Sequence, residues 1–243
     1  LEGKEFIRER QYVRAEEKLA ECLAKDANYL PALTDLAMVR YRNMDYPKAM
    51  SLLQRPLSID TYDPAANFYY GLTSLALGKK TDARDGFDLA AQDPRYRGAA
   101  YTEISRMELK DARFDAAVDY AERSLQENQF NTEAMQLLAV AQRVRPRGAS
   151  APGPADSLWL SRIRFVNPLN HFSWFESYLL KGTPAAQKNF TSGIKNELAV
   201  ESYLELAAWY YRLGLLKDAH KVLELAPSNA EVLFWLAFLD QQL

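Results

Sequence analysis

The 243-residue sequence is poor in the residues that most often hold metals or act as nucleophiles. It contains one cysteine, Cys22, and two histidines, His171 and His220. A lone thiol can form neither an internal disulfide nor a cysteine-based metal site. The histidines are far apart, and no cluster of histidine and carboxylate residues has the spacing of a ligand set. We therefore expect no metal and no cofactor.

The sequence also lacks an excess of one charge and a long apolar run. Lys and Arg number 30 against 32 Asp and Glu, a net charge of −2. A nucleic-acid-binding protein would normally show a basic excess, so we expect no such partner. No apolar run approaches the roughly 18–20 residues that span a bilayer. Glycine-rich phosphate loops, nucleophile elbows and paired-acid motifs are missing too, which predicts a protein that is not an enzyme.

The sequence begins at Leu1 without a methionine or a signal peptide. We expect a fragment or a processed product, whose targeting information has been removed. The cytoplasm is the favoured compartment. Because a chain without disulfides can also be exported, the compartment stays open.

What the sequence does contain is a repeat of small residues. Four alanines recur every 34 residues, and a fifth follows three such intervals after the fourth: Ala15, Ala49, Ala83, Ala117 and Ala219. Small or apolar residues stand four and seven positions after these alanines, which predicts one face of a helix. A second small-residue series precedes the first in the same frame: Gly3, Ala37, Gly71, Ser105, Ala139 and Ala207.

An apolar helical segment precedes each of these alanine-containing helices, and turn residues separate the two. Gly78 and Gly214 are the expected residues just past the first helix of their units. Alternation with a period of two is missing over any useful length, so we expect no strands.

A helix–turn–helix unit of about 34 residues with small residues at fixed offsets resembles the tetratricopeptide repeat (TPR). The resemblance covers most of the chain. It implies an all-α, right-handed superhelical solenoid of antiparallel helix pairs, in which small residues let neighbouring helices approach closely. It implies a single domain over 1–243 with about seven pairs, of which the first and last are incomplete.

Two places interrupt the repeat. Residues 145–157 carry prolines and glycines that cannot continue a helix, which predicts an inserted surface loop. The unit over 168–196 is shorter than the regular repeat. Within it, Thr183 as N-cap and Pro184 at the first helical position predict a helix start.

The stretch "RFVNPLNHFSWFES" (164–177) contains His171 and allows two interpretations. In the repeat frame, Asn170 caps a first helix and His171 lies in its first turn, which needs no chemistry. The alternative, a catalytic or metal-binding His171, would require a second ligand or base nearby. This stretch also resembles C-terminal repeat regions of large bacterial proteins, whose N-terminal domains have been linked to carbohydrate chemistry.

In the TPR family the first helices of the pairs line a concave groove, and the resemblance implies a partner site there. The groove residues it implies are Met38, Tyr41, Arg42, Phe68, Leu72, Arg106, Lys110, Arg143 and Tyr211. This mixed apolar and basic lining favours a protein or peptide partner with some acidic character.

The leading functional hypothesis is a non-catalytic scaffold that binds a protein or peptide and forms part of a larger protein. The alternative is an accessory repeat region of a multidomain enzyme, such as a carbohydrate-active one, with its catalytic domain outside this sequence. RNA binding is a third hypothesis, and the net charge counts against it.

The last predicted helix, 231–240, carries eight apolar residues in a row, from Val232 to Leu239. Such a run covers every side of a helix. We expect the preceding helices to bury Leu233, Leu236 and Ala237. Exposed Trp235, Phe238 and Leu239 would then form an apolar patch, covered by further chain or by a second copy.

Overall fold

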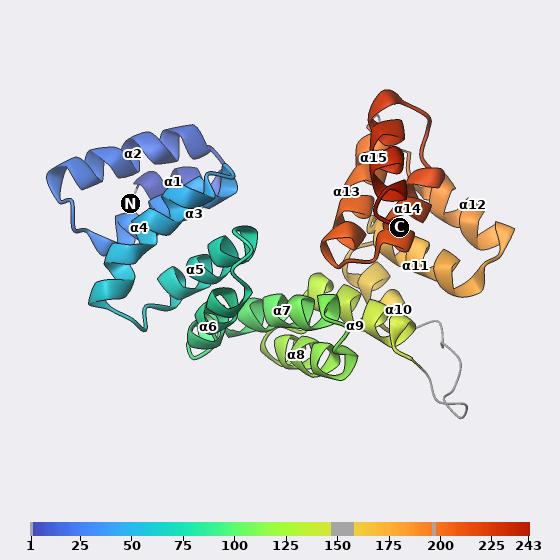
Figure 1. Ribbon diagram of the computed structural model, residues 1–243, viewed down its shortest axis with the longest axis horizontal. Coiled ribbons are helices and arrows are strands. Elements are labelled where there is room, and N and C mark those ends of the chain that lie inside the picture. The colour runs from blue at the N-terminus through green and yellow to red at the C-terminus, as the bar shows by residue number, and fades with distance from the viewer. Residues whose placement is uncertain (1, 147–157, 196–197) are drawn as a thin grey trace. The chain divides into compact units, whose positions relative to one another are not determined.

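A computed structural model of the chain describes residues 2–146, 158–195 and 198–243. Every regular element in these residues is an α-helix, and short turns join the consecutive helices between which no residue is left undescribed (Figure 1). The predicted all-α architecture of helix pairs is confirmed. Among the described helices, none has both the length and the apolar character needed to cross a bilayer.

The chain divides into two compact units, Leu1–Tyr101 and Thr102–Leu243, and helix α7 contains the boundary. The helices up to this boundary are α1 (Glu2–Arg8), α2 (Tyr12–Lys25), α3 (Leu30–Arg42), α4 (Tyr46–Ile59), α5 (Pro64–Ala76), α6 (Lys80–Ala90) and α7 (Pro94–Lys110). Those that follow are α8 (Phe114–Glu127), α9 (Thr132–Val144), α10 (Leu158–Val166), α11 (His171–Lys181), α12 (Pro184–Gly193), α13 (Ala199–Arg212), α14 (Leu216–Glu224) and α15 (Ala230–Asp240). The single domain over 1–243 stays a prediction. The loop expected at 145–157 lies, from residue 147 onward, outside the described residues.

The two series of small residues are the contact points within the helix pairs. All five alanines of the first series are at most 1% exposed, and every member of the second series is buried. The hydroxyl of Ser105 donates a 2.7 Å hydrogen bond to the carbonyl oxygen of Ala117, which joins the two series directly. Small side chains at these positions let the paired helices approach closely.

The helices of the pair α5–α6 in the first unit are packed closely together. A Cβ placed on Gly86 would lie 2.8 Å from the carbonyl oxygen of Asn67 and 2.9 Å from the nitrogen of Gly71. A Cβ on Gly71 would lie 2.7 Å from the ring of Phe87. Because the nearest atoms to Gly86 are backbone atoms, no side-chain movement could make room there. Glycine is therefore required at residue 86 by packing.

The turns inside the pairs repeat one backbone conformation. Arg10, Met44, Gly78 and Ala112 recur at the same interval as the alanine series, and Gly214 follows three intervals later; all five have φ between 57° and 75°. This left-handed conformation follows the first helix in these five pairs. The prediction for Gly78 and Gly214 is confirmed. The three other residues carry a Cβ and adopt the same conformation at a steric cost.

Side-chain caps begin several helices at the predicted residues. Asn170 Oδ1 accepts a 3.2 Å hydrogen bond from the backbone nitrogen of Ser173. Thr183 Oγ1 accepts one of 3.3 Å from the nitrogen of Ala186, with Pro184 at the start of α12. Both predicted N-caps are confirmed. His171 is half-buried in the first turn of α11, where burial lowers its pKa although Glu205 raises it.

The second unit has one continuous core that runs from α7 to α15. Aromatic rings fill much of it around α11 and α13. Phe175 lies 5.1 Å from Phe190 and 5.4 Å from Tyr210 between ring centroids, and Phe190 lies 5.6 Å from Tyr203. These large side chains occupy the region where the sequence departs from the regular repeat.

Candidate partner-binding surfaces

The nine predicted groove residues are divided between the two units. The first unit contains Met38, Tyr41 and Arg42 on α3 and Phe68 and Leu72 on α5. Met38, Tyr41, Phe68 and Leu72 are half-buried, and Arg42 is exposed. These five therefore remain available as a surface of the first unit.

Phe68 is the centre of an aromatic group in the first unit. Its ring centroid lies 5.6 Å from that of Tyr96 on α7 and 5.7 Å from that of Tyr69. Burial raises the pKa of Tyr69 to about 12. Asp35, on α3, lies 3.7 Å from Lys4, and burial raises the pKa of its carboxyl group. The surface thus offers neighbouring aromatic and ionic groups.

Carboxylates neutralise Arg106 and Arg143, two of the three predicted basic residues of the second unit. Arg106 is paired with Glu133, and its Nε lies 3.4 Å from Glu103 Oε2. Lys110 is exposed at the end of α7, with its stem next to Gly214. Arg106 therefore contributes little free positive charge to a groove.

Arg143 belongs to a buried network that joins four helices of the second unit. Its Nε and Nη2 donate hydrogen bonds of 2.7 and 3.0 Å to the two carboxylate oxygens of Glu176 on α11. Nη2 also lies 2.6 Å from Asp218 Oδ2 on α14. The hydroxyl of Tyr210 on α13 donates a 2.7 Å hydrogen bond to Glu176 Oε1. The network links α9, α11, α13 and α14.

Burial dominates the electrostatics of this network. The Glu176 side chain is 1% exposed and that of Arg143 17%. Burial raises the pKa of Glu176, although Arg143 and the Tyr210 hydroxyl lower it. Burial, and then the Glu176 carboxylate, raise the pKa of Tyr210 well above its usual range. Such a network is costly to break, because a charge left alone in the interior loses both water and partner.

A groove lies between α13 and α15 in the second unit and has a volume of about 530 Å³. Its apolar lining includes Leu204, Ala208 and Tyr211 from α13 and Trp235 from α15. Tyr211 is 40% exposed and Trp235 37%. The charged residues at the groove are Glu205, Arg212 and Glu231. Of the nine predicted residues, Tyr211 is the one that lines this groove.

The orientation of α15 corrects the expectation for this helix. Leu239 is buried, with 2% exposure, together with Val232, whereas Leu233 and Ala237 are exposed. Helix α15 therefore turns Leu239 toward the core and leaves Leu233 outside. Sequence periodicity could not choose between the faces because all of them are apolar.

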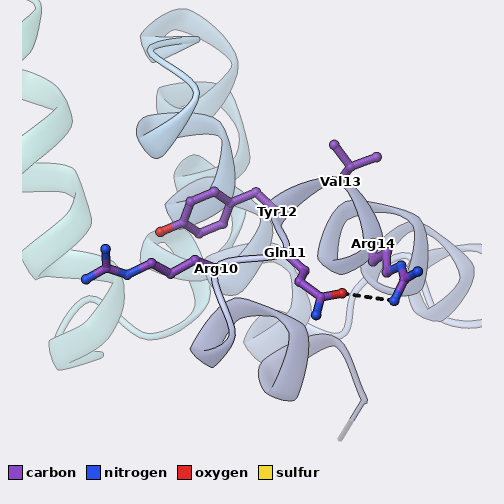
Figure 2. A pocket seen from close by; sticks show the side chains of 5 residues that line it. All are labelled: Arg10, Gln11, Tyr12, Val13 and Arg14. Carbon is purple, nitrogen blue, oxygen red and sulfur yellow. Dashed lines mark hydrogen bonds between the residues drawn. The ribbon is translucent and has the colours of Figure 1, made fainter. Parts of the chain in front are cut away.

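A second hollow lies at the turn between α1 and α2 (Figure 2). Five consecutive residues, Arg10–Arg14, line it, and Arg14 Nη1 donates a 3.0 Å hydrogen bond to Gln11 Oε1. Figure 2 shows Arg10 and Tyr12 extending away from this pair. Because one short turn supplies the whole lining, we interpret the hollow as a depression of the surface and not as a binding site. In the described part of the chain, no group of three or more His, Cys, Asp or Glu residues is arranged to hold a metal ion.

The fold is similar to solved TPR structures. PilW, a type IV pilus biogenesis factor, matches with a TM-score of 0.69 and 19% identity over 83% of this chain and 94% of its own. A TPR protein from Parabacteroides merdae matches with a TM-score of 0.63 and 14% identity over 98% of this chain and 96% of its own. YrrB, a TPR protein with an unusual peptide-binding site, matches with a TM-score of 0.51 and 13% identity over 94% and 100%.

No family model matches the sequence, and the comparison with curated proteins finds no match. The structural likeness confirms that the chain has the TPR fold, as the small-residue pattern predicted. At these identities the likeness concerns the fold alone.

Sequence reasoning missed the partners of Arg143. Glu176 and Tyr210 follow Arg143 by close to one and two repeat lengths. The repeat frame therefore indicated that these three residues hold similar positions on the first helices α9, α11 and α13. Asp218, on a second helix, is outside that register. Which of the many charged residues would meet in the interior depends on how the helices pack.

Proposed function

We propose that this chain is a non-catalytic scaffold that binds a protein or peptide, and that the groove between α13 and α15 holds an apolar side chain of the partner. The observation that supports this most is the pair of partly exposed aromatic residues, Tyr211 and Trp235, on facing walls of the 530 Å³ groove. Partly exposed Tyr and Trp residues often dominate binding energy at protein interfaces.

The dimensions and chemistry of the groove support a segment of polypeptide as its occupant. Its volume is within the range of roughly 300–1,000 Å³ that is typical of ligand sites. The two carboxylates, Glu205 and Glu231, outnumber the single guanidinium of Arg212 at its edge. The preferred partner segment therefore carries a large apolar side chain next to a Lys or Arg. The acidic preference expected from Arg106 and Arg143 loses its support because both face carboxylates.

Selection of peptides from a random displayed library on the purified chain would test this function. We expect selected peptides to combine an aromatic or aliphatic residue with a basic one. Tyr211→Ala and Trp235→Ala should each weaken their binding about tenfold or more, equivalent to about 1.4 kcal/mol. Tyr62→Ala removes a 67% exposed ring from the first unit and is the control. Peptides that bind all four proteins equally would contradict this groove as the site.

A further inference from the structure

A hollow separate from the groove lies in the second unit, where helix α10 meets the turn between α8 and α9. Its volume is about 280 Å³, and we call it the α10 hollow. The described residues that line it are Gln129, Phe130, Ser161, Arg162, Phe165 and Val166. The first two belong to the turn and the other four to α10, and none of the six lines the groove.

The surface at the α10 hollow is apolar, which sets α10 apart from α8, the second helix of the preceding pair. On α10, Leu158 is 66% exposed and Phe165 84%, and Phe130 on the turn is 58% exposed. The exposed residues of α8 are all polar or charged: Asp115, Asp119, Glu122, Arg123, Gln126 and Glu127. Exposed apolar side chains that gather on one surface mark an interaction site.

Arg162 gives the α10 hollow a positive charge that no ion pair neutralises within the described chain. Its guanidinium lies 5.4 Å from the ring centroid of Trp159, and α10 contains no Asp or Glu. Arg123 on α8 stacks in the same way on Tyr120, at 5.3 Å, but it also lies 2.9 Å from Asp119. Because stacking already holds the Arg162 guanidinium in place, little conformational freedom is lost when it binds a carboxylate.

The segments next to the α10 hollow in the sequence do not supply an occupant. Helices α9 and α11 pack on the opposite side of α10, where Leu160 and Ile163 are buried (Figure 1). The stretch 147–157 before α10 reads RGASAPGPADS, in which no apolar side chain is larger than that of proline. An occupant with a large apolar side chain and a carboxylate therefore comes from elsewhere.

The small volume and single charge of the α10 hollow favour a peptide over a membrane surface. Helices that lie on membranes carry several Lys or Arg residues beside a long apolar face. Arg164, the other cation of α10, is held by α11: it lies 4.9 Å from the ring centroid of Trp174 and donates to Ser177 Oγ at 3.3 Å. A volume below the roughly 300 Å³ of whole-ligand sites suits one side chain of a peptide.

We propose that the α10 hollow binds an acidic segment of a partner protein. One large apolar side chain of this segment lies between Phe130 and Phe165. An Asp or Glu close to it in the segment accepts hydrogen bonds from the Arg162 guanidinium, and such charge-assisted hydrogen bonds are stronger than neutral ones. The groove of the proposed function is expected to prefer a basic segment. The two sites thus differ in charge preference, and this proposal does not depend on the other.

Parallel selections from a library of random displayed peptides test the charge preference. The targets are the unmodified 243-residue chain, Arg162→Glu and Arg123→Glu. Arg123→Glu is the matched control, because it reverses a stacked arginine of the same unit that is already paired. We expect peptides that combine Asp or Glu with a large apolar residue to be enriched on the unmodified chain and on Arg123→Glu. They should be missing from the selection on Arg162→Glu.

Affinities of the selected acidic peptides locate the binding. Fluorescence anisotropy of a labelled peptide should show at least tenfold weaker binding to Arg162→Glu and about fivefold weaker binding to Phe165→Ala. Phe234→Ala removes a 64% exposed ring from α15 and should leave the affinity unchanged. Replacing the Asp or Glu of the peptide by its amide should weaken binding to the unmodified chain and have no further effect on Arg162→Glu. Circular dichroism and the melting temperature check that each variant is folded.

Four outcomes would overturn the proposal. Failure to enrich acidic peptides, or equal enrichment on Arg162→Glu, would exclude the α10 hollow as their site. Acidic peptides that bind Phe165→Ala normally and lose binding to Tyr211→Ala would occupy the groove instead. Phosphatidylserine vesicles that bind the unmodified chain and not Phe165→Ala, without any selected peptide, would assign the surface to a membrane. A dimer that Phe165→Ala dissociates in sedimentation would assign it to a second copy.

Discussion

The pair α5–α6 in the first unit and the helices α9, α11 and α13 in the second are held together in different ways. In the first, glycines let two backbones touch, with Gly86 against Asn67 and Gly71. In the second, the Arg143–Glu176 ion pair and buried rings such as Phe175 lie between the helices. The comparison teaches that the TPR fold tolerates two kinds of contact where its helices meet.

The two kinds of contact correspond to different residues at the same position of the repeat. Gly71 is the eighth residue after the N-cap of α5, whereas Tyr178 stands at that position in α11. Tyr178 is half-buried, and its ring centroid lies 6.1 Å from that of Phe175 and 5.3 Å from Lys221 Nζ, so side chains meet at this position. Buried aromatic rings join the aliphatic side chains of the core here, and the hydrogen bonds around Glu176 satisfy the polar atoms among them.

Loss of the Arg143–Glu176 ion pair in the second unit should have the largest effect on stability. Arg143→Ala would leave the Glu176 carboxylate buried without its charge partner, and we expect the free energy of unfolding to fall by about 3–5 kcal/mol. Urea denaturation followed through the aromatic fluorescence of the second unit would measure it. A loss below about 1 kcal/mol would show that water replaces the guanidinium.

The same variant should have a characteristic pH dependence. A carboxyl group whose folded pKa lies above its unfolded pKa costs stability when ionised, and that cost disappears as pH falls toward the unfolded value near 4.3. Burial already raises the pKa of Glu176, and loss of Arg143 raises it further. The deficit of Arg143→Ala should therefore shrink between pH 7 and pH 5. A deficit that is constant over this range would exclude the unpaired carboxylate as its cause.

Breaking the backbone contact of the first unit should have the next largest effect. In Gly86→Ala the new Cβ would meet backbone atoms at 2.8–3.0 Å, so α5 and α6 must separate. We expect a loss of about 2–3 kcal/mol, typical of overpacking. The control is Gly193→Ala in α12, where a Cβ has no neighbour within 4 Å. It should leave stability unchanged or raise it by up to about 1 kcal/mol. Equal effects of both changes would contradict close packing at Gly86.

Substitutions in the left-handed turns, which occur in both units, should have the smallest effects on stability. Met44→Gly and Ala112→Gly should each raise stability by about 1 kcal/mol, because both residues have left-handed backbones in which a Cβ is strained. Gly78→Ala should lower it by a similar amount. Urea midpoints at unchanged m-values would report these shifts in both units. A destabilised Ala112→Gly would show that its Cβ contributes packing that outweighs the strain.

Much of the fold could be predicted because the repeat leaves local marks. The alanine series, the turn glycines Gly78 and Gly214 and the caps at Asn170 and Thr183 all depend on residues close in sequence. The candidate sites were harder to predict. Tyr211 was identified from its place on a first helix, whereas the facing wall at Trp235 depends on how α13 and α15 pack.

The sequence by itself determined the helices, their order in pairs and the small residues at which pairs meet, because helix periodicity and steric size act locally. Tertiary structure alone decided that Arg143 serves the interior rather than a binding surface, since ion pairing across 33 and 75 residues requires the folded chain. It also decided the orientation of α15. A helix that is apolar on every side has no preferred face until its neighbours cover one of them.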